Sequence, residues 1–168
     1  MNFNADGTIQ PITVNKKGVG ALRPDVERSP NLALSAHATA SSIRPNYHVA
    51  LHSKQGLERV ETYAPTNAID GYNGTRWMAA SDDQNAWLQV DLGAPREIHR
   101  TEAYFVRPAA GHAYKLEYSL DGKSWKTYGE HDQVVICSPH RDAKPVRARY
   151  LKLTILKGIP GLWEFRVY

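Results

Sequence analysis

The loop around Asp70 carries residue types whose spacing suits a calcium ion. Calcium takes about six to eight oxygen ligands, drawn from carboxylates, hydroxyls and backbone carbonyls. Asp70 supplies a carboxylate, and Thr75 adds a hydroxyl and a carbonyl. Gly71 and Gly74 permit the tight turning that points several carbonyls inward. The sequence therefore predicts a calcium site, with an Asx-type turn that holds the same loop without metal as the alternative.

The sequence lacks the signatures of a catalytic site. Asp82 and Asp83 are adjacent, whereas the two carboxylates of a glycosidase must stand on opposite sides of the scissile bond. The seven histidines are dispersed, and His48 and His52 have no intervening glutamate for a zinc-protease helix. Cys137 lies in an apolar run, as expected of a small packed side chain. We expect no enzyme activity from this chain alone.

Length and composition describe one ordinary globular domain. The 168 residues are 42% hydrophobic and 23% charged, with 21 Lys and Arg against 17 Asp and Glu, a net charge of +4. The basic residues do not cluster, so the sequence predicts no nucleic-acid partner. The sequence contains no run of about 18 apolar residues and therefore predicts no membrane-spanning helix. A single cysteine excludes an internal disulfide.

Short alternating segments indicate an all-β protein. Apolar and polar residues alternate over 87–92, 114–119 and 150–155, as in half-buried strands. Asp121-Gly122 is a strong tight-turn signal. One short helix is possible over 49–60. Further strands are expected at 98–106, 125–128, 134–137 and 162–168. Many short strands without intervening helices predict an antiparallel β-sandwich or jelly roll.

Four motifs in order resemble one family. They read NLALS with TASS, NAIDGYNGTRW, WLQVDLG and YSLDGKSW, and they start at Asn31, Asn67, Trp87 and Tyr118. Together with the terminal Trp-Glu-Phe, they resemble the discoidin domain, or coagulation factor 5/8 type C domain. The bacterial branch, carbohydrate-binding module family 32, is the most similar. The resemblance covers 31–168 and implies a galactose-binding-domain-like, eight-stranded jelly roll with ligand loops at one end.

The resemblance also implies a ligand set for the calcium ion. The matching positions are Asn67, Asp70, Tyr72, Thr75, Trp163 and Glu164. Tyr72 and Trp163 would contribute backbone carbonyls only. Such an ion would be structural, because it would tie the last strand to the Asp70 loop.

Candidate sugar contacts lie in three predicted loops. Aromatic rings cover the C–H face of a sugar, and charged or amide groups bind its hydroxyls. We expect Tyr63 as the platform and Asp82, Arg107 and His112 as hydrogen-bonding partners for a neutral glycan. Tyr63 could equally pack in the core, and the other three could be solvated loop residues. The connection 43–66 is longer than in the resembling family and could enlarge or cover the site.

The function implied is that of a non-catalytic carbohydrate-binding module. Residues 1–30 are rich in Gly and Pro, and their start resembles the tail of a glycoside hydrolase family 43 domain. We expect them to form a leader that adds no strand to the sandwich. The chain lacks a signal-peptide pattern. We expect a monomeric module of a secreted, periplasmic or cell-surface bacterial hydrolase, acting on plant cell-wall or galactose-containing polysaccharide. A structural or protein-interaction module that binds no sugar is the alternative.

Overall fold

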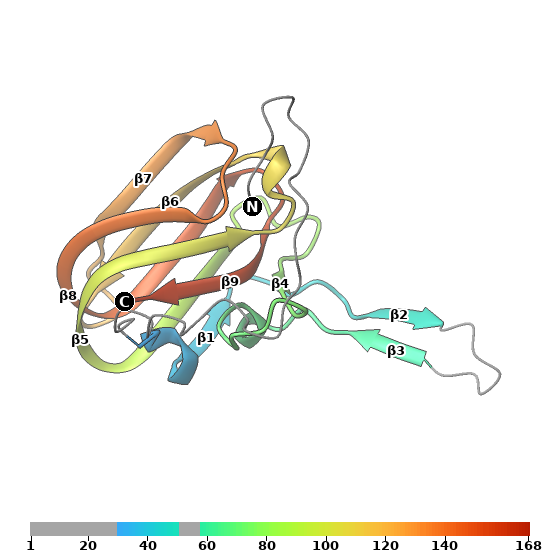
Figure 1. Cartoon of the computed structure of the whole chain (residues 1–168), viewed down its shortest axis with the longest axis horizontal. Helices are drawn as coiled ribbons and strands as arrows, with labels where there is room; N and C mark the ends of the chain where they lie inside the picture. Colours follow the sequence, from blue (N-terminus) through green and yellow to red (C-terminus); the bar gives the residue numbers. More distant parts are fainter. Residues whose placement is uncertain (1–29, 51–57) are drawn as a thin grey trace, which may run out of the picture.

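The computed structural model describes residues 30–50 and 58–168 (Figure 1). The strands of this part are β1 (His37–Ala40), β2 (Tyr47–Ala50), β3 (Glu58–Glu61), β4 (Trp77–Met78), β5 (Trp87–Phe105), β6 (His112–Ser119), β7 (Lys126–Val135), β8 (His140–Lys157) and β9 (Gly161–Val167). Three short 3-10 helices join them, η1 (Leu32–Ser35), η2 (Pro65–Ala68) and η3 (Pro108–Ala110). None of these helices is long and apolar enough to cross a membrane.

Two long, bent strands build both layers of the sandwich. The first part of β5 pairs with β1 and with the end of β8, and its last part pairs with β9 and with the start of β8. The β5–β8 register shifts between Asp91 and Arg96 and again between Ile98 and Arg100. Such irregularities bend a strand and increase its twist. The bend is visible at the left of Figure 1. The resulting strand order is β4-β9-β5-β8-β6-β7, with β1 beside β5, and these neighbouring strands pair in antiparallel fashion.

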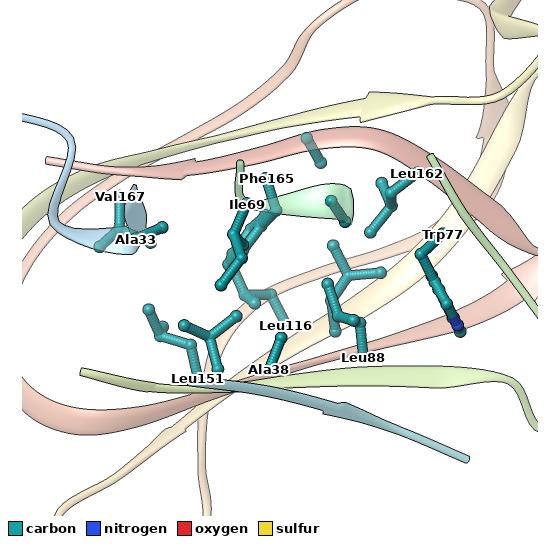
Figure 2. Packing of buried hydrophobic residues seen from close by; sticks show 14 of the residues in the cluster. Ala33, Ala38, Ile69, Trp77, Leu88, Leu116, Leu151, Leu162, Phe165 and Val167 are labelled. Carbon is teal, nitrogen blue, oxygen red and sulfur yellow. The ribbon is translucent and has the colours of Figure 1, made fainter. Parts of the chain in front are cut away.

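The core lies between the layers and follows the alternation of the sequence. Leu88 and Val90 of β5 point inward and are at most 1% exposed, as are Leu151 and Leu153 of β8. Figure 2 shows this cluster extending from Val167 and Ala33 to Trp77. Full burial of a large apolar side chain contributes about 1.5–3 kcal/mol.

The predicted antiparallel β-sandwich is confirmed, and its details differ in two ways. Segments 87–92 and 98–106, expected as separate strands, are joined in β5, and 125–128 and 134–137 are largely joined in β7. The short helix considered possible over 49–60 is contradicted at both of its ends, because β2 and β3 form an antiparallel pair that projects from the sandwich (Figure 1), while residues 51–57 lie outside the described residues. The leader expected over 1–30 lies, apart from Pro30, outside the described residues.

Candidate functional site

A cavity of about 610 Å³ opens beside β4 and β9 and is called the arginine pocket here. Its volume falls in the usual range for small-molecule sites. Its lining combines three arginines and one tryptophan with apolar side chains. The lining residues are Arg44, Arg76, Met78, Ala79, Ser81, Val106, Arg107, Ile159, Pro160 and Trp163.

Backbone hydrogen bonds hold the walls of the pocket together. The Arg44 amide donates to the Met78 carbonyl at 2.9 Å, and the Ala79 amide donates to the Pro160 carbonyl at 2.9 Å. Gly161 packs so closely that a Cβ there would lie 2.8 Å from the Trp77 carbonyl oxygen. The turn between β8 and β9 can therefore reach β4 only because this position is glycine.

Arg76 is a lining residue of the pocket that is held in place by an ion pair and two aromatic rings. Its Nη2 lies 2.9 Å from Glu61 Oε2. Its guanidinium lies 5.1 Å from the ring centroid of Tyr63 and 4.8 Å from that of Trp163, within the range of cation–π contacts. Tyr63, predicted as the sugar platform, is only 5% exposed and donates its hydroxyl to Glu61 at 3.2 Å. This burial favours the packing role that the sequence left open for Tyr63, although its side chain also borders a second cavity together with Arg44 and Arg76.

His112 also departs from its predicted role. Its side chain is fully buried and stacks on Phe105 with ring centroids 4.4 Å apart. Its Nε2 lies 3.3 Å from the Ile159 carbonyl oxygen, while its Nδ1 has no partner among the described residues. Because no part of the ring is exposed, it is closed to a sugar at the surface. The predicted contact of His112 with a glycan is therefore corrected.

His112 belongs to a closed group, the histidine cluster, which consists of Phe105, His112, Tyr114 and His140. The His140 ring meets those of Phe105 and Tyr114 edge-on, with centroids 5.1 and 5.3 Å away. Burial lowers the pKa of both histidines, because a charged imidazole is poorly solvated there. Their packing favours the neutral forms.

The Asp82–Asp83 loop divides into one structural and one exposed residue. Asp83 accepts a hydrogen bond from the Ser42 hydroxyl at 2.6 Å and another from the Ser41 hydroxyl. These hydrogen bonds lower the pKa of Asp83. Asp82 is exposed and follows Ser81, a lining residue of the pocket.

Of the four predicted sugar contacts, Arg107 alone lines the arginine pocket. Sequence reasoning did not single out Arg44 or Arg76, and it assigned Trp163 only a carbonyl role. Arg44 stands in the long connection that the sequence marked as unusual, which was the one available signal. Arg76 and Trp163 sit in the quoted motifs, but nothing in their spacing indicates that their side chains meet.

Hydrogen bonds to the Asp70 carboxylate hold the predicted calcium loop together. The carboxylate accepts from the Tyr72 amide at 2.8 Å and from the Thr75 hydroxyl at 2.6 Å. The side-chain amide of Asn67 donates to the carbonyls of Thr62 and Arg76 at 2.9 and 3.2 Å. These bonds form the Asx-type turn that the sequence offered as an alternative.

Glu164 supplies a second carboxylate from β9. It is 3% exposed, and its Oε1 accepts from the Gly71 amide at 3.3 Å. Its Oε2 has no hydrogen-bond partner among the described residues. Burial raises the pKa of Glu164 to about 7, and nearby Asp70 adds to the effect. A buried carboxylate oxygen without a protein partner is normally neutralised by a proton or bound by a cation or a water molecule.

The residues present fit a calcium ion. Within 30–50 and 58–168 no group of three or more His, Cys, Asp or Glu side chains gathers as a metal site. A cation would therefore depend on the two carboxylates of Asp70 and Glu164 together with backbone carbonyls and the Thr75 hydroxyl. Calcium accepts such a mixed oxygen set.

Solved structures with a similar fold include carbohydrate-binding proteins. A protein described as a glycoside hydrolase is 43% identical with a TM-score of 0.80, covering 99% of this chain and 38% of that one. Chitosan-binding module 1 of a Paenibacillus sp. IK-5 chitosanase/glucanase is 25% identical with a TM-score of 0.64, covering 83% of this chain and 99% of the module.

Sequence comparison gives the family. Lactadherin of Mus musculus is 30% identical over 105 residues, which cover 54% of this chain and 21% of lactadherin. The chain thus matches about a fifth of the length of this curated relative. The family model described as the F5/8 type C domain matches residues 38–165. This chain belongs to the F5/8 type C domain family.

Proposed function

We propose that this chain is a non-catalytic carbohydrate-binding module whose glycan site is the arginine pocket. The carrying observation is the composition of that pocket. Trp163, Val106 and Ile159 give it an aromatic and apolar surface, while Arg44 and Arg107 provide hydrogen-bond donors at its wall. Sugars combine apolar C–H faces with hydroxyls, so a pocket of this mixed character suits them.

The relatives favour the same function. The protein that is 25% identical is described as a chitosan-binding module, and the similarity covers nearly its whole length. The glycoside hydrolase at 43% identity is much longer than the region it shares with this chain. We infer that the module belongs to a longer polysaccharide-degrading protein that acts outside the cytoplasm. Its contribution would be a higher local concentration of the enzyme at its substrate.

The test is titration calorimetry of the full chain with plant cell-wall and galactose-containing oligosaccharides. A shallow site predicts a dissociation constant on the order of 0.1–1 mM. Trp163→Ala should weaken binding at least about tenfold, because it removes the aromatic wall. Trp125→Ala is the matched control, since that half-buried tryptophan lies outside the arginine pocket, over Lys152.

Two results would contradict this function. If no oligosaccharide gives binding heat, the structural or protein-interaction module becomes the better description. If Trp163→Ala and Trp125→Ala weaken binding equally while both remain folded, the glycan site lies outside the arginine pocket. Thermal melts of both variants provide the folding control.

We also propose a structural calcium ion between the Asp70 loop and β9. The carrying observation is the buried Glu164 with its unpartnered Oε2 beside that loop. Asp70, Glu164 and Thr75 would hold the ion, with carbonyls from Asn67, Tyr72 and Trp163. Calcium binding the folded state would stabilise it by about 2.7 kcal/mol at about one hundred times its dissociation constant.

Chemical unfolding in calcium and in chelator tests this ion. Glu164→Gln keeps the side-chain size and removes the charge, so it should abolish the calcium response. Glu97→Gln, at an exposed glutamate on the bend of β5, should keep the response. Identical unfolding of the unaltered chain in calcium and in chelator would mean that a proton, not a metal, neutralises Glu164.

A further inference from the structure

The arginine pocket has an unbalanced charge. Among the lining residues that the structure describes, three of ten are arginines and none is aspartate or glutamate. The arginines come from three separate parts of the chain: Arg44 from the segment after β1, Arg76 from the residue before β4, and Arg107 from the turn after β5. Arginines that are far apart in the sequence therefore come together at one cavity in the fold.

Arg76 is the one whose charge is already compensated. Glu61 lies 2.9 Å from its Nη2, and the rings of Tyr63 and Trp163 lie within cation–π distance of its guanidinium. Its side chain is therefore held in place by residues of this chain.

Arg44 and Arg107 differ from Arg76. Neither side chain forms a hydrogen bond or an ion pair with any residue of the described part of the chain. Both backbones are nevertheless held, because the Arg44 amide donates to the Met78 carbonyl and the Arg107 carbonyl accepts from the Ala110 amide at 3.0 Å. The backbones of Arg44 and Arg107 are thus fixed, and both guanidinium groups border the same pocket without a charge partner among the described residues.

The conformation of Arg107 adds an independent observation. Its φ is +52°, the one positive φ of a non-glycine residue within the described ranges. A residue with a Cβ in this left-handed region costs about 1–2 kcal/mol relative to its preferred conformations, and glycine or asparagine would cost less. Strained backbone of this kind is concentrated at binding and catalytic sites.

Arginines elsewhere in the described sandwich are mostly paired. Arg149 binds Asp91 with two hydrogen bonds of 2.7 and 2.9 Å, and Arg141 binds Glu102 at 3.0 Å. Arg44 and Arg107, which have no such partner among residues 30–50 and 58–168, therefore differ from these arginines.

We propose that the arginine pocket takes an anionic sugar, whose carboxylate or sulfate group is bound between Arg44 and Arg107. Guanidinium groups match the planar oxygens of such anions and form charge-assisted hydrogen bonds with them. Trp163 and the apolar wall would contact the sugar ring. This inference rests on the proposed glycan-binding function and narrows its ligand from the neutral glycan expected from the sequence to an acidic one.

Titration calorimetry of the full chain with three probes tests the inference. The probes are a galacturonate trisaccharide, its fully methyl-esterified form, and a sulfated galactose oligosaccharide. At least one anionic probe should bind about tenfold or more tighter than the methyl ester, and added salt should reduce that advantage. The galacturonate and sulfated arms then identify which anionic group is preferred.

Arginine variants locate the charge effect. Arg44→Gln with Arg107→Gln should reduce the preference for the anionic probe to below about threefold while leaving weak binding of the methyl ester. Arg96→Gln is the matched control, because Arg96 is exposed on the bend of β5 and lies outside the pocket lining. It removes one charge and should leave the preference unchanged.

The failures are distinguishable. Equal binding of the anionic probes and the methyl ester, lost in Trp163→Ala, would overturn the acidic ligand and keep the glycan site. Absence of binding by all three probes and by neutral oligosaccharides would overturn the glycan-binding function together with this inference. A preference for the anion that persists in the double arginine variant would place the anion elsewhere.

Discussion

The two regions on either side of the end of β5 use similar residue types in opposite ways. On one side, Phe105 lies in the histidine cluster, where aromatic rings fill the space and His112 is fully buried. On the other side, Arg107 borders the arginine pocket, a cavity of about 610 Å³. Aromatic rings and nitrogen-bearing side chains meet in both regions, but the histidines of the first are packed and neutral, whereas the arginines of the second border a cavity.

Backbone geometry accounts for which of the two regions stays open. Residues two apart in a regular strand face the same side. Phe105 and Arg107 do not continue such a strand, because β5 ends at Phe105 and Arg107 takes a left-handed conformation. The β5–β9 register also shifts between Tyr104 and Phe105. The irregular backbone redirects Arg107 to the pocket and leaves Phe105 in the core.

The largest expected effect is in the closed region. Phe105→Ala would leave a cavity between His112, Tyr114 and His140 and should lower the free energy of unfolding by about 3–5 kcal/mol. Urea unfolding followed by tryptophan fluorescence measures the change. A loss below about 1 kcal/mol would show that the histidine cluster is not a packed core and would remove the contrast between the two regions.

A smaller effect should follow pH. The folded state lowers the pKa of His112 and His140, so the unfolded chain takes up protons first as the pH falls below about 6.5. His112 faces the Ile159 carbonyl. His140 faces His112, His131 and Asp142, and the negative Asp142 opposes the lowering. The two histidines should therefore lower the free energy of unfolding as the pH falls from about 7 to about 5, whereas Glu164, whose pKa is raised to about 7, contributes in the opposite direction.

Urea unfolding across this pH range measures the slope. Each unit by which a histidine pKa is lowered corresponds to about 1.4 kcal/mol when the unfolded form is fully protonated. His140→Gln removes one of the two groups and should flatten the slope. His99→Gln, at an exposed histidine, should leave it unchanged. A slope that is the same in all three proteins would contradict a neutral His140 in the folded state.

The smallest effect is expected in the open region. Arg107→Gln removes an exposed guanidinium that contacts no partner among the described residues, so the free energy of unfolding should change by less than about 0.5 kcal/mol. The same variant should nevertheless weaken binding of an anionic oligosaccharide. A large loss of stability would mean that Arg107 holds the fold together, which would erase the distinction between a packed and a ligand-binding region.

The sandwich could be predicted from the sequence because period-two alternation directly reports a buried face. Leu88 and Val90 show this, and both are core residues. The same signal could not reveal that β5 bends and continues from Trp87 to Phe105, because bulges depend on the pairing partner. Nor could it identify the projecting β2–β3 pair, whose segment offered an equally plausible helical spacing.

The predicted sugar site was harder because its residues are separated in sequence. Tyr63 and His112 have the chemistry of sugar contacts, but burial removes them from the surface, and burial depends on distant neighbours such as Met78 and Phe105. Arg107 was predicted, and the structure places it at the pocket. The calcium ligand set stays a prediction, although the unpartnered Glu164 carboxylate gives it a physical motive.

The β2–β3 pair has a consequence for how this domain can be altered. Its first and last residues, Tyr47 and Glu61, are register partners, so the two ends of the inserted segment lie about 5 Å apart. A short turn could therefore replace residues 48–60 and still leave Glu61 in place for its ion pair with Arg76. A longer segment could be inserted between the same two positions. The segment between Tyr47 and Glu61 can thus be shortened, extended or exchanged without a change in the strand order of the sandwich.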